Sequence, residues 1–208
     1  MSIFVQVGAG AGDRDPRSTY RDGFTEYVKR LDKSTIDKII LIEPNPMNIA
    51  ELQKCWADYP QAEIHQVGIC TQMYNASTIK FYYAEQDGPH FHVASMKREH
   101  VEQYYRFPGD TIKEIDIPCV SLQGFINQII GDNRIDLLCI DIEGMEGDII
   151  PEINWKNLNC HQLSFEFCHL GDKQENVLRT LGNAGYIFMG TGIDYQGGDW
   201  LFENIGLK

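Results

Sequence analysis

Carboxylates and a histidine follow two apolar segments of the chain, at positions where their side chains could do chemistry. Asp141, Glu143 and Glu146 lie directly after one apolar segment, and Glu166 and His169 come at the end of another. Carboxylates that gather at the end of a buried segment cost stability unless they are solvated, paired or used in a reaction. These residues are therefore candidate functional groups, with a solvated charged turn as the alternative.

A glycine-rich loop follows the first apolar segment, residues 4–7. Gly8, Gly10 and Gly12 alternate with alanines there. Because glycine has no side chain, such a loop lets the backbone approach a ligand closely, although a tight turn without a ligand is the alternative. A dinucleotide fingerprint requires a small residue at the position that Asp13 occupies. An acid there disfavours a pyrophosphate and tolerates a cationic ligand.

The next apolar segment ends at Glu43, which is placed to accept hydrogen bonds from both hydroxyls of a ribose. A solvated acid at the end of a strand is the alternative interpretation. Together, the glycine loop and this acid favour S-adenosylmethionine over NAD as the cofactor. The residues that we assign to cofactor binding are Gly8, Gly10, Gly12, Glu43, Asn45, Gln66, Gly68 and Asp141.

The elements that must position these residues alternate between strands and helices. Apolar or alternating segments predict strands over residues 4–7, 39–42, 63–70, 78–84, 113–120, 137–142 and 162–168, and a terminal pair over 186–189 and 200–205. Apolar residues at helical spacing, with capping residues, predict helices that begin near Phe24, Pro46, Leu122, Ile149 and Asp172. This order indicates βαβ units and a mainly parallel sheet, in which ligands bind at the carboxyl ends of the strands.

The composition excludes several classes of protein. The chain has 208 residues, with 18 Lys and Arg against 30 Asp and Glu, and therefore a net charge of −12. This charge disfavours nucleic acids and acidic membrane surfaces as partners. No apolar run exceeds four residues, so we expect neither a membrane-inserted segment nor a signal peptide. Six cysteines without CxxC spacing favour free thiols and a cytoplasmic location.

Several segments together resemble the FkbM family of class I S-adenosylmethionine-dependent methyltransferases. They are residues 7–12, 42–46, 140–146 and 163–166, with weaker landmarks at 94–96, 120–122 and 200–202. The resemblance implies one α/β methyltransferase domain over residues 1–208. Its Rossmann-like fold has a mainly parallel seven-stranded sheet, helices on both faces and an antiparallel C-terminal strand. The family usually has an acid where Gln6 stands, Asn at Gly10 and Lys at Cys139.

The resemblance implies O-methylation of a hydroxyl on a sugar, a glycan precursor or a secondary metabolite. An alcohol nucleophile needs a base within hydrogen-bond reach, and Asp141 is the best-placed candidate, at the methionine end of the cofactor. Glu143, Glu166 and His169 follow similar strand ends and complete the candidate catalytic set on the acceptor side. Residues 85–111 form the longest irregular stretch, which we interpret as a substrate-side insert or lid, with a solvated loop as the alternative.

Other functions remain open at this point. Asp141 with Glu143 could hold a divalent cation, and His90 with His92 has a suitable spacing, but the resemblance does not require a metal and we assign no metal ligands. A non-catalytic subunit that binds an adenosyl ligand is the second hypothesis, based on Gln6 and Cys139. A nicotinamide-dependent oxidoreductase is disfavoured by Asp13. The expected partner is a small-molecule or saccharide acceptor, and a homo-oligomer is possible.

Overall fold

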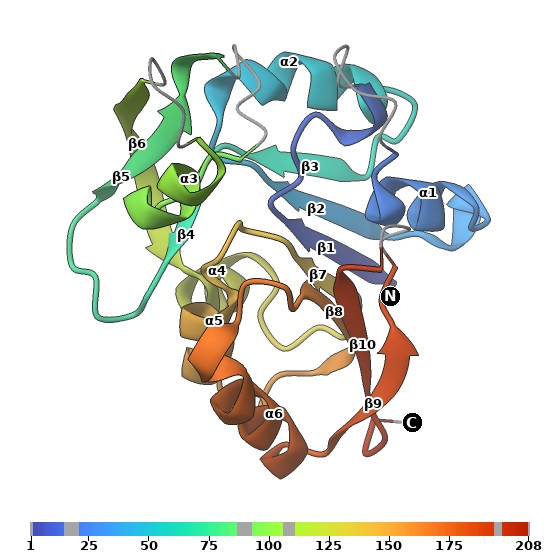
Figure 1. Ribbon diagram of the computed structural model, residues 1–208. Coiled ribbons are helices and arrows are strands. Elements are labelled where there is room, and N and C mark those ends of the chain that lie inside the picture. Colours follow the sequence, from blue (N-terminus) through green and yellow to red (C-terminus); the bar gives the residue numbers. More distant parts are fainter. Residues whose placement is uncertain (1, 15–20, 87–92, 106–110, 194–196, 208) are drawn as a thin grey trace.

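The structure is a computed structural model that describes residues 2–14, 21–86, 93–105, 111–193 and 197–207 (Figure 1). Its strands are β1 Ile3–Val7, β2 Lys38–Ile42, β3 Ala62–His65, β4 Gly68–Cys70, β5 Thr78–Ala84, β6 Ile112–Ser121, β7 Ile135–Ile140, β8 Cys160–Glu166, β9 Tyr186–Thr191 and β10 Asp199–Asn204. Its α-helices are α1 Gly23–Lys29, α2 Pro46–Cys55, α3 Arg98–Tyr104, α4 Leu122–Ile129, α5 Glu146–Ile149 and α6 Gln174–Asn183.

A seven-stranded sheet organises the molecule, in the order β3-β2-β1-β7-β8-β10-β9. The strands from β3 to β8 pair in parallel, whereas β10 is antiparallel to both of its neighbours. The order reverses between β1 and β7, the kind of switch point where open α/β sheets bind ligands. The predicted fold, a mainly parallel seven-stranded sheet with an antiparallel C-terminal strand, is confirmed.

Helices cover both faces of this sheet because successive residues of a buried strand point to opposite sides. Val5 and Val7 of β1 lie in a core that α4, α5 and α6 complete, and Phe4 lies in a second core with residues of α1 and α2. In Figure 1, α4, α5 and α6 group together on one side of the sheet. Both layers hold the strand ends in fixed positions.

Two of the predicted helix starts have the expected caps. The side chain of Asn45 accepts a hydrogen bond from Met47 N, with Pro46 as the first residue of α2, and Ser121 caps α4 in the same way. The capping box expected near Asp172 is wrong. That residue lies in a 3-10 turn, and α6 begins after Lys173 without a side-chain cap.

A second, three-stranded sheet contains β4, β6 and β5 in that order, and its presence corrects two predictions. The strand expected over residues 63–70 is two strands, since β3 ends at His65 in the large sheet and β4 begins at Gly68 in the small one. The stretch expected to be irregular contains α3, which lies beside the small sheet in Figure 1.

The parallel strands of the large sheet all end at one edge, so residues that follow β1, β2, β7 and β8 meet there. Among the described residues, no helix is long and apolar enough to cross a membrane.

Candidate active site

The glycine loop leaves β1 in a conformation that requires glycine. Gly8 has a φ of 86°, and its N–H donates to the carbonyl oxygen of Ile42 at 2.9 Å. A Cβ at Gly8 would lie 1.6 Å from the backbone oxygen of Asp141, so no larger residue fits between β1 and β7. A Cβ at Gly10, whose φ is 54°, would meet no described atom within 4 Å. The loop is therefore tight against the sheet at Gly8 and open at Gly10, where a ligand could approach the backbone.

The carboxylate of Glu43 is hydrogen-bonded to this loop. Its Oε2 accepts a hydrogen bond from Gly10 N at 2.6 Å, and its Oε1 accepts from Asn45 N at 2.7 Å and from Asn48 Nδ2 at 3.2 Å. The residue is only 4% exposed, and this burial raises the pKa of Glu43 to about 7 despite the three hydrogen bonds that lower it. Glu43 thus binds the glycine loop, and the predicted bonds to a ribose would compete with the bond to Gly10.

Gln6 stands where the family has an acid, and its side chain lies buried beneath the loop. Its Nε2 donates to Asp22 Oδ1 at 2.7 Å, and Asp22 also caps α1 by accepting from Thr25 N at 2.6 Å. The Oε1 of Gln6 is buried without a hydrogen-bond partner among the described residues. Gln6 is therefore paired with an acid, Asp22, while its Oε1 remains an acceptor without a partner among the described residues.

Three carboxylates form a cluster at the ends of β7 and β8: Asp141, Glu146 and Glu166. One oxygen of each lies within 4.8 Å of the other two. Glu146 is fully buried and accepts hydrogen bonds from Ile142 N at 2.7 Å and Gly144 N at 3.0 Å. Burial raises the pKa of Glu146 to about 7. Burial also raises the pKa of Asp141 well above its usual range, as do its acidic neighbours Glu143, Glu166, Glu146 and Asp199.

Beside these acids lies a second group, which we call the imidazole cluster: His100, Glu143 and His169. His100 Nε2 is 3.0 Å from Glu143 Oε2, and His169 Nε2 is 4.0 Å from the same oxygen. The two rings meet edge to face, with centroids 4.6 Å apart. His169 Nε2 also lies 3.3 Å from Glu166 Oε1, which joins the two clusters. Burial lowers the pKa of His169, and so does the neighbouring His100.

The backbone at Glu143 is held in a conformation that is uncommon for a residue with a side chain. Its φ of 53° places it in the left-handed region, at a cost of about 1–2 kcal/mol. Ser95 Oγ donates to the carbonyl oxygen of Glu143 at 2.7 Å, and Lys97 Nζ donates to that of Gly144 at 2.6 Å. Segment 95–97 therefore fixes the turn that aims Glu143 at the two imidazoles.

The structure brings most of the predicted site residues to one edge of the sheet. Asp141, Glu143, Glu166 and His169 meet there, at the ends of β7 and β8, beside the glycine loop that follows β1. Gln66 follows the end of β3 close to Glu43, whose N–H donates to the carbonyl oxygen of His65. Gly68 instead lies in β4, where a Cβ would be 2.8 Å from Ile117 Cδ1, so packing explains its glycine. His90 and His92 lie outside the described residues.

Three residues of this site were not assigned from the sequence. Glu146 belongs to the acidic segment, but only the structure shows that its carboxylate binds the turn. Asp22 precedes Gly23 and Phe24 as a helix cap would, which is a signal that could have been noticed. His100 lies in the stretch expected to be irregular, and nothing in its local pattern indicates Glu143 as its partner.

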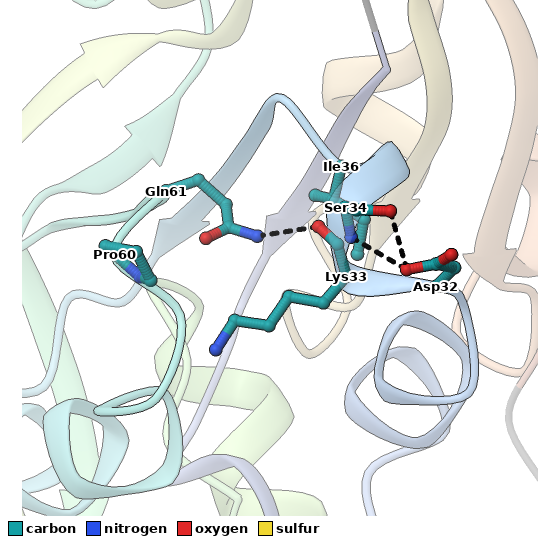
Figure 2. Close-up of a pocket in the computed structure, with 6 residues that line it drawn as sticks. All are labelled: Asp32, Lys33, Ser34, Ile36, Pro60 and Gln61. Carbon is teal, nitrogen blue, oxygen red and sulfur yellow. Dashed lines mark hydrogen bonds between the residues drawn. The ribbon is translucent and has the colours of Figure 1, made fainter.

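A pocket elsewhere on the molecule does not belong to this site. Figure 2 shows its lining residues, Asp32, Lys33, Ser34, Ile36, Pro60 and Gln61. Gln61 Nε2 donates to the carbonyl oxygen of Lys33 at 3.4 Å, and Ser34 Oγ donates to Asp32 Oδ1 at 2.8 Å. These residues precede β2 and β3, so they lie at the amino ends of the strands, opposite the carboxyl ends that gather the candidate site.

Comparison with protein families decides the broad identity of the chain. The family model described as Methyltransferase FkbM domain matches residues 6–188. The chain belongs to this family. S-adenosylmethionine is its cofactor, as the glycine loop and Glu43 predict. No curated protein matched the chain.

Solved methyltransferase structures resemble the chain at low sequence identity. The fibrillarin pre-rRNA processing protein of Methanococcus jannaschii has 10% identity and a TM-score of 0.45, with 97% of this chain and 65% of that chain covered. The fibrillarin of Aeropyrum pernix, in complex with natively bound S-adenosyl-L-methionine, has 10% identity and a TM-score of 0.43, with coverages of 97% and 64%. The precorrin-6y C5,15-methyltransferase of Geobacter metallireducens has 11% identity and a TM-score of 0.43, with coverages of 96% and 76%. The chain spans less than two thirds of the length of the two fibrillarins.

The described residues of this FkbM domain fit the cofactor. Gln6 Oε1 is a buried acceptor without a partner, which suits the ammonium group of the methionine part. The loop is open at Gly10. The carboxyl groups of Asp141, Glu146 and Glu166 at the ends of β7 and β8 provide oxygen acceptors that suit a sulfonium. All six cysteines lie in the described residues and are free thiols, as expected.

Proposed function

We propose that this FkbM methyltransferase transfers a methyl group to a hydroxyl oxygen, on a sugar, a glycan precursor or a secondary metabolite. The observation that carries the proposal is the juxtaposition of two groups at the switch point of the sheet. The glycine loop and Glu43 follow β1 and β2, and the carboxylates and His169 follow the neighbouring strands β7 and β8. This arrangement supports two parts of one site that meet at Asp141. We call the glycine loop and Glu43, which would bind the methyl donor, the donor side, and the carboxylates and imidazoles, which would bind the methyl acceptor, the acceptor side.

On the donor side, the chain mainly binds and orients the cofactor. The bound S-adenosylmethionine supplies a methyl group on a positively charged sulfur. Gln6 and Gly10 hold the methionine and ribose parts in this proposal, and Glu43 accepts from the ribose hydroxyls after exchanging its bond to Gly10. Alignment of the nucleophile with the methyl group lowers the activation free energy by several kcal/mol, as it does in other reactions between well-oriented reactants.

Asp141 is the proposed proton acceptor. It follows β7 directly, next to Gly8, and therefore lies where donor and acceptor would meet. An alcohol oxygen loses its proton as it attacks, and a carboxylate within hydrogen-bond reach accelerates that step by about 10²- to 10⁴-fold.

The acceptor is proposed to bind against the imidazole cluster and segment 93–105. Tyr104 lies in α3, and its hydroxyl is 3.4 Å from His169 Nε2. This segment is the described part of the predicted insert over residues 85–111, so it supports a role for the insert in acceptor binding. Because acids outnumber basic residues at this edge, a neutral or cationic acceptor is favoured over a strongly anionic one and over nucleic acid.

Location and assembly are part of the same proposal. The six free thiols support a cytoplasmic location, because disulfides are rare there. A homo-oligomer stays a prediction. The edge strand β9 exposes Ile187, Phe188 and Met189, but these three residues alone do not specify a partner.

The proposal is tested in two steps with the purified chain. S-adenosylmethionine and S-adenosylhomocysteine are first titrated by calorimetry, with NAD as the comparison. Formation of S-adenosylhomocysteine is then followed across a panel of sugars and hydroxylated small molecules. We expect binding of both adenosyl ligands, and turnover that the substitution Asp141→Asn lowers at least about 100-fold while ligand binding persists. Binding of NAD alone contradicts the proposal. Binding without turnover on any acceptor supports the non-catalytic adenosyl-binding subunit instead.

A further inference from the structure

We infer that His100, Glu143 and His169 form a binding site for one divalent transition-metal ion, which orients the oxygens of the acceptor. The inference rests on the proposed methyl transfer to a hydroxyl, and it deepens that function by naming how the acceptor is held. The three residues come from different parts of the chain: α3, the turn after β7, and the segment after β8. One ligand atom of each lies within 4.8 Å of the other two.

The distances are close to those around a bound ion. Metal–ligand bonds of about 2.0–2.2 Å, in tetrahedral or octahedral geometry, separate neighbouring ligand atoms by about 3.0–3.5 Å. The separation of His100 Nε2 from Glu143 Oε2 is 3.0 Å, and that of His169 Nε2 from the same oxygen is 4.0 Å. A small rotation of His169, whose side chain is partly exposed, brings its nitrogen into range. His100 is already fixed by burial.

A hydrogen bond between His100 and Glu143 accounts for only part of this arrangement. It does not explain why the Nε2 of a second imidazole, that of His169, lies 4.0 Å from the same carboxylate oxygen as well as 3.3 Å from Glu166 Oε1. It also does not explain why the backbone at Glu143 adopts a left-handed conformation, which the bonds from Ser95 and Lys97 maintain. A cation between the three ligand atoms explains both features, since it needs the carboxylate and both nitrogens at one point.

The donor set indicates the kind of ion. Two imidazoles and one carboxylate suit Mn²⁺, Fe²⁺, Co²⁺ or Zn²⁺, whereas Mg²⁺ and Ca²⁺ prefer oxygen ligands alone. Three protein ligands leave coordination positions open, and oxygens of the acceptor can occupy them. An acceptor with two neighbouring oxygens, such as the vicinal diol of a sugar, would fill two positions. The site therefore favours diols over isolated hydroxyls.

The test measures metal binding without any turnover. The full chain is freed of metal by dialysis against a chelator and titrated with Co²⁺, whose visible absorption reports the coordination of nitrogen ligands. Mg²⁺ is titrated in parallel. We expect one Co²⁺ per chain, little competition from Mg²⁺, and an affinity that His169→Gln and Glu143→Gln each lower at least about tenfold. His161→Gln is the matched control, because His161 lies near the amino end of β8 and pairs with Glu203.

The outcomes separate this inference from the proposed function. Failure of Co²⁺ to bind more tightly than about 1 mM overturns the metal site, as does binding that neither His169→Gln nor Glu143→Gln weakens or that His161→Gln abolishes. Circular dichroism melting curves establish that the variants are folded. If a variant is unfolded, Co²⁺ binding by the wild-type chain is the measurement that tests the metal site. A chain that binds S-adenosylhomocysteine but no Co²⁺ contradicts only the metal site. One that binds Co²⁺ but no adenosyl ligand contradicts only the proposed function.

Discussion

The donor side and the acceptor side of the candidate site are built in different ways. On the donor side, the loop and Glu43 follow two adjacent strands, and the key contacts join residues within 33 positions or fewer, such as Gly10 with Glu43. On the acceptor side, Glu143 meets His100 of α3, 43 positions away, and His169, which follows the end of β8. The donor side is built from residues that follow strands of the large sheet, whereas the acceptor side also depends on how α3 packs against that sheet.

This difference indicates how far the sequences of the donor side and the acceptor side can change. The glycine loop tolerates little change, because backbone hydrogen bonds to Ile42 and close packing against Asp141 fix its geometry. The acceptor side receives His100 and Tyr104 from α3, outside the large sheet, so this segment can change without altering the strand order. Substitutions on the two sides should therefore have separable effects on adenosyl binding, acceptor use and stability.

The largest expected effect is that of Gly8→Ala. The new Cβ would overlap the backbone oxygen of Asp141, 1.6 Å away, and the φ of 86° adds strain. We expect a loss of about 3 kcal/mol or more in the free energy of unfolding, together with loss of adenosyl binding. The control is Gly131→Ala, at a φ of 63° with open space around it, which should cost about 1–2 kcal/mol. Equal urea midpoints for the two variants contradict this account of the loop.

The pH dependence of stability tests the burial of Glu43. Its pKa is about 7 in the folded state against 4.5 ordinarily, so between these values the folded chain keeps a proton that the unfolded chain loses. The free energy of unfolding therefore falls as pH rises, by about 3 kcal/mol in total from this group. Urea unfolding at about pH 5 and about pH 8 should show a smaller fall for Glu43→Gln than for the wild type. Parallel curves would mean that Glu43 is not buried as described.

A crossed comparison of Glu43→Gln with Glu143→Gln sharpens the division between the two sides. Glu43→Gln should weaken S-adenosylhomocysteine binding about tenfold or more, because one of the two carboxyl oxygens that would accept from the ribose hydroxyls is replaced by an amide nitrogen, which only donates. Glu143→Gln should leave that affinity within about twofold and lower kcat/KM for the acceptor at least about tenfold. Calorimetry and initial rates give the two readouts. If both substitutions reduce S-adenosylhomocysteine affinity and kcat/KM to the same extent, the separation into a donor side and an acceptor side is contradicted.

The smallest effect is expected for Lys97→Met. This substitution removes the bond to the carbonyl oxygen of Gly144 and the ion pair with Asp148 at 2.5 Å, both partly exposed to solvent. We expect a loss of about 1 kcal/mol or less in stability and a few-fold rise in KM for the acceptor, with unchanged adenosyl affinity. Lys80→Met is the control, since Lys80 pairs with Glu114 and Asp116 on the small sheet. An equal rise in KM for Lys80→Met would contradict a specific role of segment 95–97 in acceptor binding.

The sequence by itself determined most of the strand order of the sheet and the positions of the glycine loop and Glu43. Strand and helix order, the cap at Asn45, the loop at Gly8 and the acid at Glu43 all follow from local patterns, because periodicity and turn residues act over short distances. The tertiary structure decided where one predicted strand divides between β3 and β4. It alone showed that Glu43 binds Gly10 and that His100 meets Glu143 and His169. These contacts join segments far apart in the chain, and packing rather than local propensity brings them together.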